Sequence, residues 1–228
     1  MAIRQRAIQA ADKQERHHAI LDAAERLLLR APDRVANMAD VADEAELAKG
    51  TVYLYFPSKE ELLLALHERN LDEFFRSLNA LLDGARRVTL DDLLAVTFEH
   101  IVRRPVFLPL AARSFALMAQ SIPAAAAVAY RERMAARLER AGAGLERHFP
   151  RLEPGGGVAK LRHSFALTIG LWQMSAAAGC ASSPEIAGAA TPGRVMSPVF
   201  AWNYPDELGR ALRGLWQVVA AVPPTPAS

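Results

Sequence analysis

The chain has 228 residues, of which 51% are hydrophobic and 23% are charged, and its formal net charge at pH 7 is +2. This length allows one compact domain or two small ones, and the mild charge excludes a diffuse basic surface as the basis of binding. A single cysteine, Cys180, excludes an intramolecular disulfide. The longest uncharged stretch, 164–184, is a poor membrane span and no signal peptide opens the chain, so we expect a cytoplasmic protein without a membrane partner.

The first predicted helix covers about 13–30, because apolar residues recur three or four positions apart from Ile20 to Leu28. Pro32 follows its end. A basic N-terminal arm precedes or opens this helix, and it either lies along phosphates, enters a minor groove, or is a solvated flexible terminus. Its cations are Arg4, Arg6, Lys13 and Arg16.

Two short amphipathic helices come next, over about 38–45 and 49–56, with the tight turn 46–48 between them. Asn37 is the expected N-cap of the first, because its side-chain oxygen can accept a hydrogen bond from a free backbone N–H. Gly50 destabilises the second by roughly 1 kcal/mol relative to alanine, which indicates that another molecule approaches the backbone there. This layout is typical of a helix-turn-helix DNA-binding motif.

Pro57 ends the second short helix, and a longer helix begins directly after it and runs to about Gly84. Ser58 and Glu61 have the spacing of a capping box at its start. Lys59 lies in the first turn, where the helix dipole disfavours a cation, and a bound phosphate would offset that mismatch.

The run from Lys49 to Leu62, Lys-Gly-Thr-Val-Tyr-Leu-Tyr-Phe-Pro-Ser-Lys-Glu-Glu-Leu, resembles the recognition-helix signature of the tetracycline-repressor (TetR) family of bacterial transcription regulators. The clear resemblance covers about residues 14–66. It implies that Lys49, Gly50 and Thr51 approach base edges or phosphates in the major groove. It also implies that Tyr53 and Tyr55 make aromatic contacts to DNA and that Lys59 clamps a phosphate.

Asn37 stands where the family usually has a threonine that caps this helix and touches phosphate. Three positions depart from the family pattern: Ala39, Glu46 and Ala48 replace an arginine, a glycine and a serine. We therefore expect an altered turn, because a non-glycine residue with positive φ at Glu46 is strained.

The remaining sequence predicts helices and no strands, so the expected fold class is all-α: an N-terminal three-helix helix-turn-helix DNA-binding domain (1–57) plus a C-terminal helical ligand-binding and dimerisation domain (58–222). A disordered tail is expected over 223–228. The further predicted helices cover about 89–104, 107–120, 123–149, 158–180, 184–190 and 205–222.

Small and apolar residues on the helices at 158–180 and 205–222 indicate that two chains pair through a four-helix bundle, giving a homodimer. A dimer suits a DNA reader, because one short recognition helix contacts few bases. The alternative is that both helices serve only the core of one chain. The predicted contact residues are Leu212, Leu215 and Val219 together with the face 176–179.

Aromatic and polar residues in the middle of the chain could converge on a pocket for a small hydrophobic effector, although each aromatic or methionine side chain taken alone is more often part of an ordinary core. Arg113 is more informative, since a cation among apolar neighbours needs a carboxylate partner or an anionic ligand. The predicted ligand-binding residues are Phe74, Phe107, Arg113, Phe115, Met118, Tyr130, Phe165 and Trp172.

An enzyme is an alternative interpretation of an all-helical chain with an apolar interior, but no catalytic motif supports it. The sequence has no His-Glu-x-x-His, no phosphate loop, no metal-ligand spacing among its histidines and no base beside Cys180, so we expect no catalytic residue, cofactor or metal. A non-catalytic carrier of a hydrophobic molecule would leave the segment 49–59 unexplained. The prediction is a ligand-responsive regulator of transcription, a repressor that an effector releases from a palindromic operator.

Overall fold

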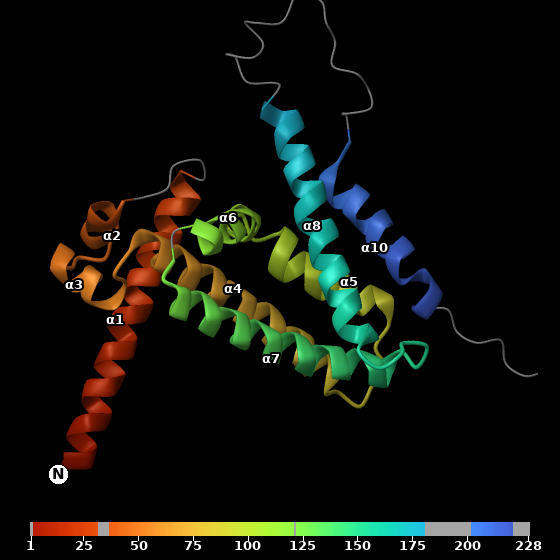
Figure 1. The fold of residues 1–228 in the computed structure, drawn as a ribbon, viewed down its shortest axis with the longest axis horizontal. Helices are drawn as coiled ribbons and strands as arrows, with labels where there is room; N and C mark the ends of the chain where they lie inside the picture. Colours follow the sequence, from red (N-terminus) through yellow and green to blue (C-terminus); the bar gives the residue numbers. More distant parts are fainter. Residues whose placement is uncertain (1, 32–36, 121, 181–201, 221–228) are drawn as a thin grey trace, which may run out of the picture. The chain divides into compact units, whose positions relative to one another are not determined.

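The computed structural model describes residues 2–31, 37–120, 122–180 and 202–220, and within these ranges the side chains of 2–11, 115–120, 176–180 and 220 lie outside the description. The described residues form helices connected by turns and contain no strand, which confirms the all-α prediction (Figure 1). The helices are α1 (Ala2–Arg30), α2 (Met38–Glu44), α3 (Lys49–Tyr55), α4 (Lys59–Leu82), α5 (Leu90–Thr97), η1 (Phe98–Val102), α6 (Phe107–Gln120), α7 (Ala124–His148), α8 (Gly156–Cys180) and α10 (Tyr204–Ala220).

The chain divides into two compact units. The first consists of residues 1–72 and 104–127, and therefore holds α1 to α3, the first part of α4, and α6. The second consists of residues 73–103 and 128–228, and holds the end of α4, α5, η1, most of α7, α8 and α10.

Most helix boundaries agree with the sequence to within a few residues, and α1 is the exception. We expected this helix to begin near Lys13 after a flexible arm, but α1 begins at Ala2. The reason is local propensity, because residues 2–12 contain no glycine or proline and are rich in alanine, glutamine and arginine. The predicted short helix at 184–190 and the tail at 223–228 lie outside the described residues.

The core of the first unit joins five helices, because apolar side chains from α1, α2, α3, α4 and the start of α6 pack in one cluster. Val52 of α3 is fully buried and Phe56, just after α3, is 4% exposed. Leu47, in the turn before α3, packs against this core as a partly buried side chain. The buried members are Ile20, Leu21, Ala23, Ala24, Leu28, Met38, Val41, Ala42, Val52, Phe56, Leu62, Leu63, Leu66, Val106 and Leu110.

Ion pairs fix α1 against its neighbours in this unit. Glu44 of α2 accepts hydrogen bonds from Arg26, at 2.6 Å, and from Arg30, both on α1. These guanidinium groups hold the pKa of the Glu44 carboxyl below its ordinary value. Arg69 of α4 donates to Asp22 and Glu25 of α1, each at 2.5 Å.

The turn between α2 and α3 has the strain that the sequence predicts. Glu46 has φ of 55°, the left-handed region that favours glycine. The Glu46 N–H donates to the Asp43 carbonyl at 3.2 Å, and the Leu47 N–H donates to the Ala42 carbonyl at 2.9 Å. These carbonyls at the C-terminus of α2 are therefore hydrogen-bonded although the turn has no glycine.

In the second unit, α8 and α10 lie side by side (Figure 1) and share a core with α5. Leu94, Leu208 and Leu212 are its buried members. The prediction that Leu212 contacts a second subunit is therefore wrong: Leu212 is 2% exposed, because the apolar stripe of α10 that contains it faces α5 and α8 of its own chain.

Polar contacts add to this pairing. Trp216 donates its indole N–H to Ser164 Oγ at 3.0 Å, and Tyr204 donates its hydroxyl to the Thr168 carbonyl at 3.0 Å. Two cations donate to carbonyls in the C-terminal part of α10, Lys160 to Leu215 at 2.7 Å and Arg151 to Val218 at 3.2 Å.

A close crossing of α7 and α8 depends on two glycines. A Cβ atom built on Gly157 would lie 2.2 Å from the carbonyl oxygen of Gly142, so neither helix could approach the other with a larger residue there. His148, at the end of α7, accepts from the Val88 N–H through Nδ1 and therefore donates from Nε2 to the Leu82 carbonyl at 2.9 Å, which ties α7 to the end of α4.

His67 is a polar residue in the core of the first unit. It is 2% exposed, its ring lies edge-on to Phe107 with the centroids 5.4 Å apart, and its Nδ1 has no hydrogen-bond partner among the described residues. Burial lowers its pKa from 6.5 to about 4, so the folded protein holds this imidazole neutral.

This burial predicts a pH-dependent stability. Below about pH 6.5 the unfolded chain binds a proton at His67 and the folded chain does not. The free energy of unfolding is therefore unaffected by His67 above that pH, and it falls as the pH is lowered until the folded protein also binds the proton at about pH 4. The loss should amount to roughly 3 kcal/mol. Urea unfolding at about pH 7.5 and about pH 4.5 should show a smaller loss for His67→Gln than for the parent. His163→Gln, at an exposed histidine, is the control and should lose as much stability as the parent. If His67→Gln loses as much stability between the two pH values as the parent does, the prediction is wrong.

Candidate nucleic-acid interface

The orientation of α3 follows from its seven-residue sequence. Successive residues of a helix are rotated by about 100°, so Gly50 and Leu54 both lie nearly opposite the fully buried Val52. The exposure pattern agrees: Lys49, Gly50, Tyr53 and Leu54 are exposed, while Thr51 and Tyr55 are half-buried at the sides. One face of α3 is therefore held by the core and the other faces outward.

Side-chain caps fix the helices on either side of α3. Asn37 Oδ1 accepts from the N–H groups of Ala39, at 2.8 Å, and Asp40, at 2.9 Å, which confirms the predicted cap of α2. Ser58 Oγ accepts from the Glu61 N–H at 3.1 Å and donates to the Glu61 carboxylate at 3.3 Å, which confirms the cap of α4. Ala48 gives α3 no side-chain cap.

The exposed cation of α3 lies against an aromatic ring. The Lys49 ammonium is 5.9 Å from the centroid of the Tyr53 ring, within the range of a cation–π contact. Tyr53 is 42% exposed, so ring and ammonium both remain accessible. Lys59 is half-buried as the first residue of α4.

A cavity of about 430 Å³ lies between α1 and the end of α3 and is open to solvent. Lys13 and Arg16 from α1 line it together with Asp12, and Leu54 and Tyr55 line it from α3. Figure 1 shows that the N-terminal half of α1 projects beyond α2 and α3. Of the predicted basic residues of this segment, Lys13 and Arg16 are thus placed beside α3 by a helix. The side chains of Arg4 and Arg6 lie outside the described residues.

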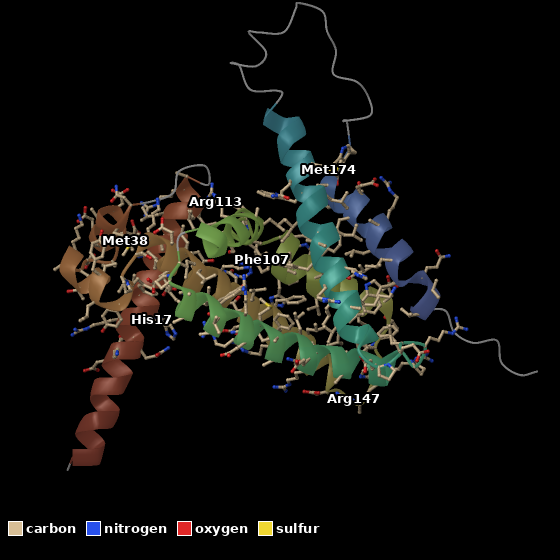
Figure 2. The ribbon with its side chains drawn as sticks, viewed as in Figure 1. His17, Met38, Phe107, Arg113, Arg147 and Met174 are labelled. Atoms are coloured by element: carbon tan, nitrogen blue, oxygen red, sulfur yellow. The ribbon has the colours of Figure 1, made fainter. Side chains whose placement is uncertain are left out.

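The ring of His17 helps to position α3 from the α1 side. The centroids of the His17 and Phe56 rings are 4.8 Å apart, and Phe56 directly follows α3. His17 is labelled on α1 in Figure 2. Burial, His18 and Arg69 lower the pKa of His17, which therefore favours the neutral ring. Sequence reasoning did not assign this contact, because the two residues are far apart in the chain.

Leu54 is the exposed residue that the sequence analysis left without a role. It is 82% exposed, more than any other large hydrophobic side chain among the described residues. The signal was present in the spacing from Val52, which places Leu54 on the outer face of α3.

The predicted ligand-binding residues are divided between the two units. In the first unit, Phe107 is fully buried against His67, and the half-buried Arg113 already interacts with another group of the protein. Both are labelled in Figure 2. The side chains of Phe115 and Met118 lie outside the described residues.

In the second unit, Phe74 and Tyr130 are buried, and the Phe74 ring contacts Phe75 edge-on with the centroids 5.2 Å apart. Phe165 and Trp172 are half-buried on α8. Among the described residues, no group of three or more histidine, cysteine, aspartate or glutamate side chains could hold a metal ion, and no helix is both long and apolar enough to cross a membrane.

Two solved structures from Streptomyces coelicolor have a similar fold. The transcriptional regulator SCO7518 of strain A3(2) matches with a TM-score of 0.52 and 18% identity over 91% of this chain and 99% of its own. A TetR-family transcriptional regulator matches with a TM-score of 0.52 and 19% identity over 90% of this chain and 99% of its own. At this identity the similarity establishes the fold.

Two sequence relatives come from Bacillus subtilis (strain 168). The uncharacterized HTH-type transcriptional regulator YfiR is 34% identical over 40% of this chain and 52% of its own length. The uncharacterized HTH-type transcriptional regulator YuxN is 31% identical over 41% of this chain and 33% of its own length. The chain thus spans about half of the first relative and a third of the second.

Two family models match consecutive segments of the chain. Residues 20–66, which contain α2 and α3, match the model of bacterial regulatory proteins of the TetR family. Residues 68–217 match the tetracyclin repressor-like C-terminal domain and make up more than half of the sequence. With a helix-turn-helix formed by α2 and α3 ahead of a helical C-terminal domain, the chain belongs to the TetR family of transcriptional regulators.

Proposed function

We propose that this protein is a homodimeric repressor that binds a palindromic operator through α3 and is released by a small hydrophobic effector. The observation that carries the proposal is the outward face of α3, which the buried Val52 and Phe56 hold in a fixed orientation. The proposed DNA contacts are Asn37, Lys49, Gly50, Thr51, Tyr53, Tyr55 and Lys59.

Local cations support this interface better than net charge does. Among the described residues, no ion pair engages Lys49 or Lys59, and Lys13 and Arg16 line the cavity beside α3. Each ammonium that reaches a phosphate releases a counterion, so such a surface binds DNA with an affinity that falls as salt rises. The side-chain oxygen of Asn37 is engaged in capping α2, so its amide N–H groups are the donors that would contact a phosphate.

Operator binding should depend on salt through these lysines. Lys49→Ala and Lys59→Ala should each reduce the slope of log K against log salt by about 0.9 per lost contact, or roughly 2 in a dimer. This slope is measured by fluorescence anisotropy with a labelled DNA duplex from the region upstream of the protein's own gene. Arg103→Ala, which removes an exposed cation outside the first unit, is the control and should leave the slope unchanged. Equal affinity for random duplex at every salt concentration would refute the operator proposal.

The dimer is proposed to form through the outer faces of α8 and α10, a refinement of the face expected from sequence. Met174, labelled in Figure 2, is 60% exposed and Val218 is 74% exposed. A Cβ atom added to Gly170 or Gly214 would meet nothing within 4 Å, so a second pair of helices could approach both closely. Leu215 and Val219 are half-buried beside this face, and the side chains of 176–179 lie outside the described residues.

Val218→Glu should convert the dimer to a monomer. Two unpaired carboxylates buried in the seam would cost about 3 kcal/mol or more, which raises the dissociation constant roughly a hundredfold. The exposure of Val218 leaves the fold of the monomer intact. Sedimentation at micromolar concentration should give half the parental mass, and Gln217→Glu, on the neighbouring exposed position, is the control. A parent protein that is already monomeric would contradict the dimer.

The effector is proposed to bind the helical body formed by residues 68–217. The family match to a tetracyclin repressor-like C-terminal domain supports this part of the proposal. Arg113 interacts with another group of the protein, so the proposal does not depend on an acid group in the ligand. The proposed contacts remain Phe74, Phe107, Arg113, Phe115, Met118, Tyr130, Phe165 and Trp172.

Release requires a ligand that prefers the conformation that does not bind DNA. Lowering operator occupancy from about 99% to about 1% takes a preference of roughly 5.5 kcal/mol between the two conformations. A library of hydrophobic compounds should yield molecules that quench the tryptophan fluorescence and lower operator anisotropy over the same concentration range. Binders that leave operator affinity unchanged throughout such a library would contradict the effector proposal.

A further inference from the structure

The middle of the outward face of α3 offers no hydrogen-bonding side chain. Gly50 and Leu54 lie one turn apart on this face, nearly opposite Val52. The polar residues flank them, with Lys49 and Tyr53 on one side and Thr51 and Tyr55 on the other. A surface that reads bases only by hydrogen bonds would carry a donor or acceptor at this place.

A single exposed leucine is common on protein surfaces and by itself indicates nothing. Leu54 differs in its setting. Its side chain is 82% exposed and borders the cavity that Lys13 and Arg16 line, and the Lys49 ammonium lies over the Tyr53 ring on the other side. An exposed apolar side chain with accessible cations around it is complementary to a polyanion that carries an apolar group on its surface.

Gly50 adds an independent observation. A Cβ atom built there would meet nothing within 4 Å, so packing within the protein does not require glycine at this position. The space above Gly50 is open, and the neighbouring turn presents the Leu54 side chain. Another molecule can therefore approach the backbone at Gly50 while it contacts the Leu54 methyl groups.

The major groove of DNA contains one apolar group, the C5-methyl of thymine, which apolar side chains contact directly. We propose that Leu54 is a specificity-determining residue that packs on the C5-methyl group of a thymine in each half-site, and that Gly50 allows the approach. The inference rests on the proposed operator binding by α3 and adds the base that the centre of this helix selects.

Deoxyuridine tests the contact, because it differs from thymidine only by that methyl group. The duplex is one that the protein itself enriches from a random-sequence library, with each thymine replaced singly by deoxyuridine. At one symmetry-related pair of positions, loss of the methyl should weaken binding by the parent protein about fourfold per half-site, or roughly fifteenfold for both. Replacement of other thymines should have little effect.

Variants of Leu54 complete a double-mutant cycle. Leu54→Ala should bind the thymine duplex more weakly by a similar factor and should not distinguish it from the deoxyuridine duplex, whereas Leu54→Met should retain the distinction. Leu29→Ala is the matched control, since Leu29 is a 48% exposed leucine of the same unit outside α3, and it should behave as the parent. Circular dichroism checks that each variant remains folded.

The possible outcomes separate the two proposals. If no thymine is sensitive to loss of its methyl, or if Leu54→Ala loses the same factor as the parent on deoxyuridine, the role of Leu54 is refuted and operator binding stands. If the library yields no preferred duplex, the proposed operator binding fails and the role of Leu54 fails with it. The inference is supported if the loss of affinity on deoxyuridine replacement is absent in Leu54→Ala and present in the parent, Leu54→Met and Leu29→Ala.

Discussion

A helix of seven residues is too short to be stable by itself, and this constraint governs the whole DNA-binding unit. The orientation of α3 is imposed by Val52 and Phe56, which are buried in a core built by α1, α2, α4 and α6. His17 adds a ring contact to Phe56, and Arg26, Arg30 and Arg69 fix α1 to α2 and α4 through carboxylates. The orientation of the outward face of α3 is therefore set by the core beneath it.

The start of α6 belongs to the same core. Val106 and Leu110 pack with the residues of the helix-turn-helix, and Phe107 lies against the buried His67. Close-packed interiors do not deform continuously, so a displacement of this end of α6 must change the packing of α4 and of the helices that α4 supports. An effector that moved α6 would thus reach α3 through direct contacts within one unit.

The sequence predicted the features that depend on local chemistry. The caps at Asn37 and Ser58 follow from a few neighbouring residues, and the strain at Glu46 was expected because the family that the chain resembles has glycine there; the structure has all three features. The assignments that failed depend on distant residues or on competing local preferences. Leu212 lies on an apolar stripe, but a stripe does not identify what covers it, and here α5 and α8 of the same chain do. No role was predicted for Leu54, although its spacing from Val52 places it on the outer face of α3. The DNA contacts and the effector pocket stay predictions.

The open space above Gly50 and the exposure of Leu54 also bear on how such regulators diverge. Folding stability resides in Val52 and Phe56, whereas the two outward positions make no contact with the core. If the proposed DNA contacts hold, substitutions at position 54 would change the preferred operator with little effect on the free energy of unfolding, and replacement of Gly50 by a residue of higher helix propensity would in addition stabilise α3 by up to roughly 1 kcal/mol. A duplicated copy of this gene could acquire new target sites by single substitutions at these positions, and selection for a stable fold would not oppose them.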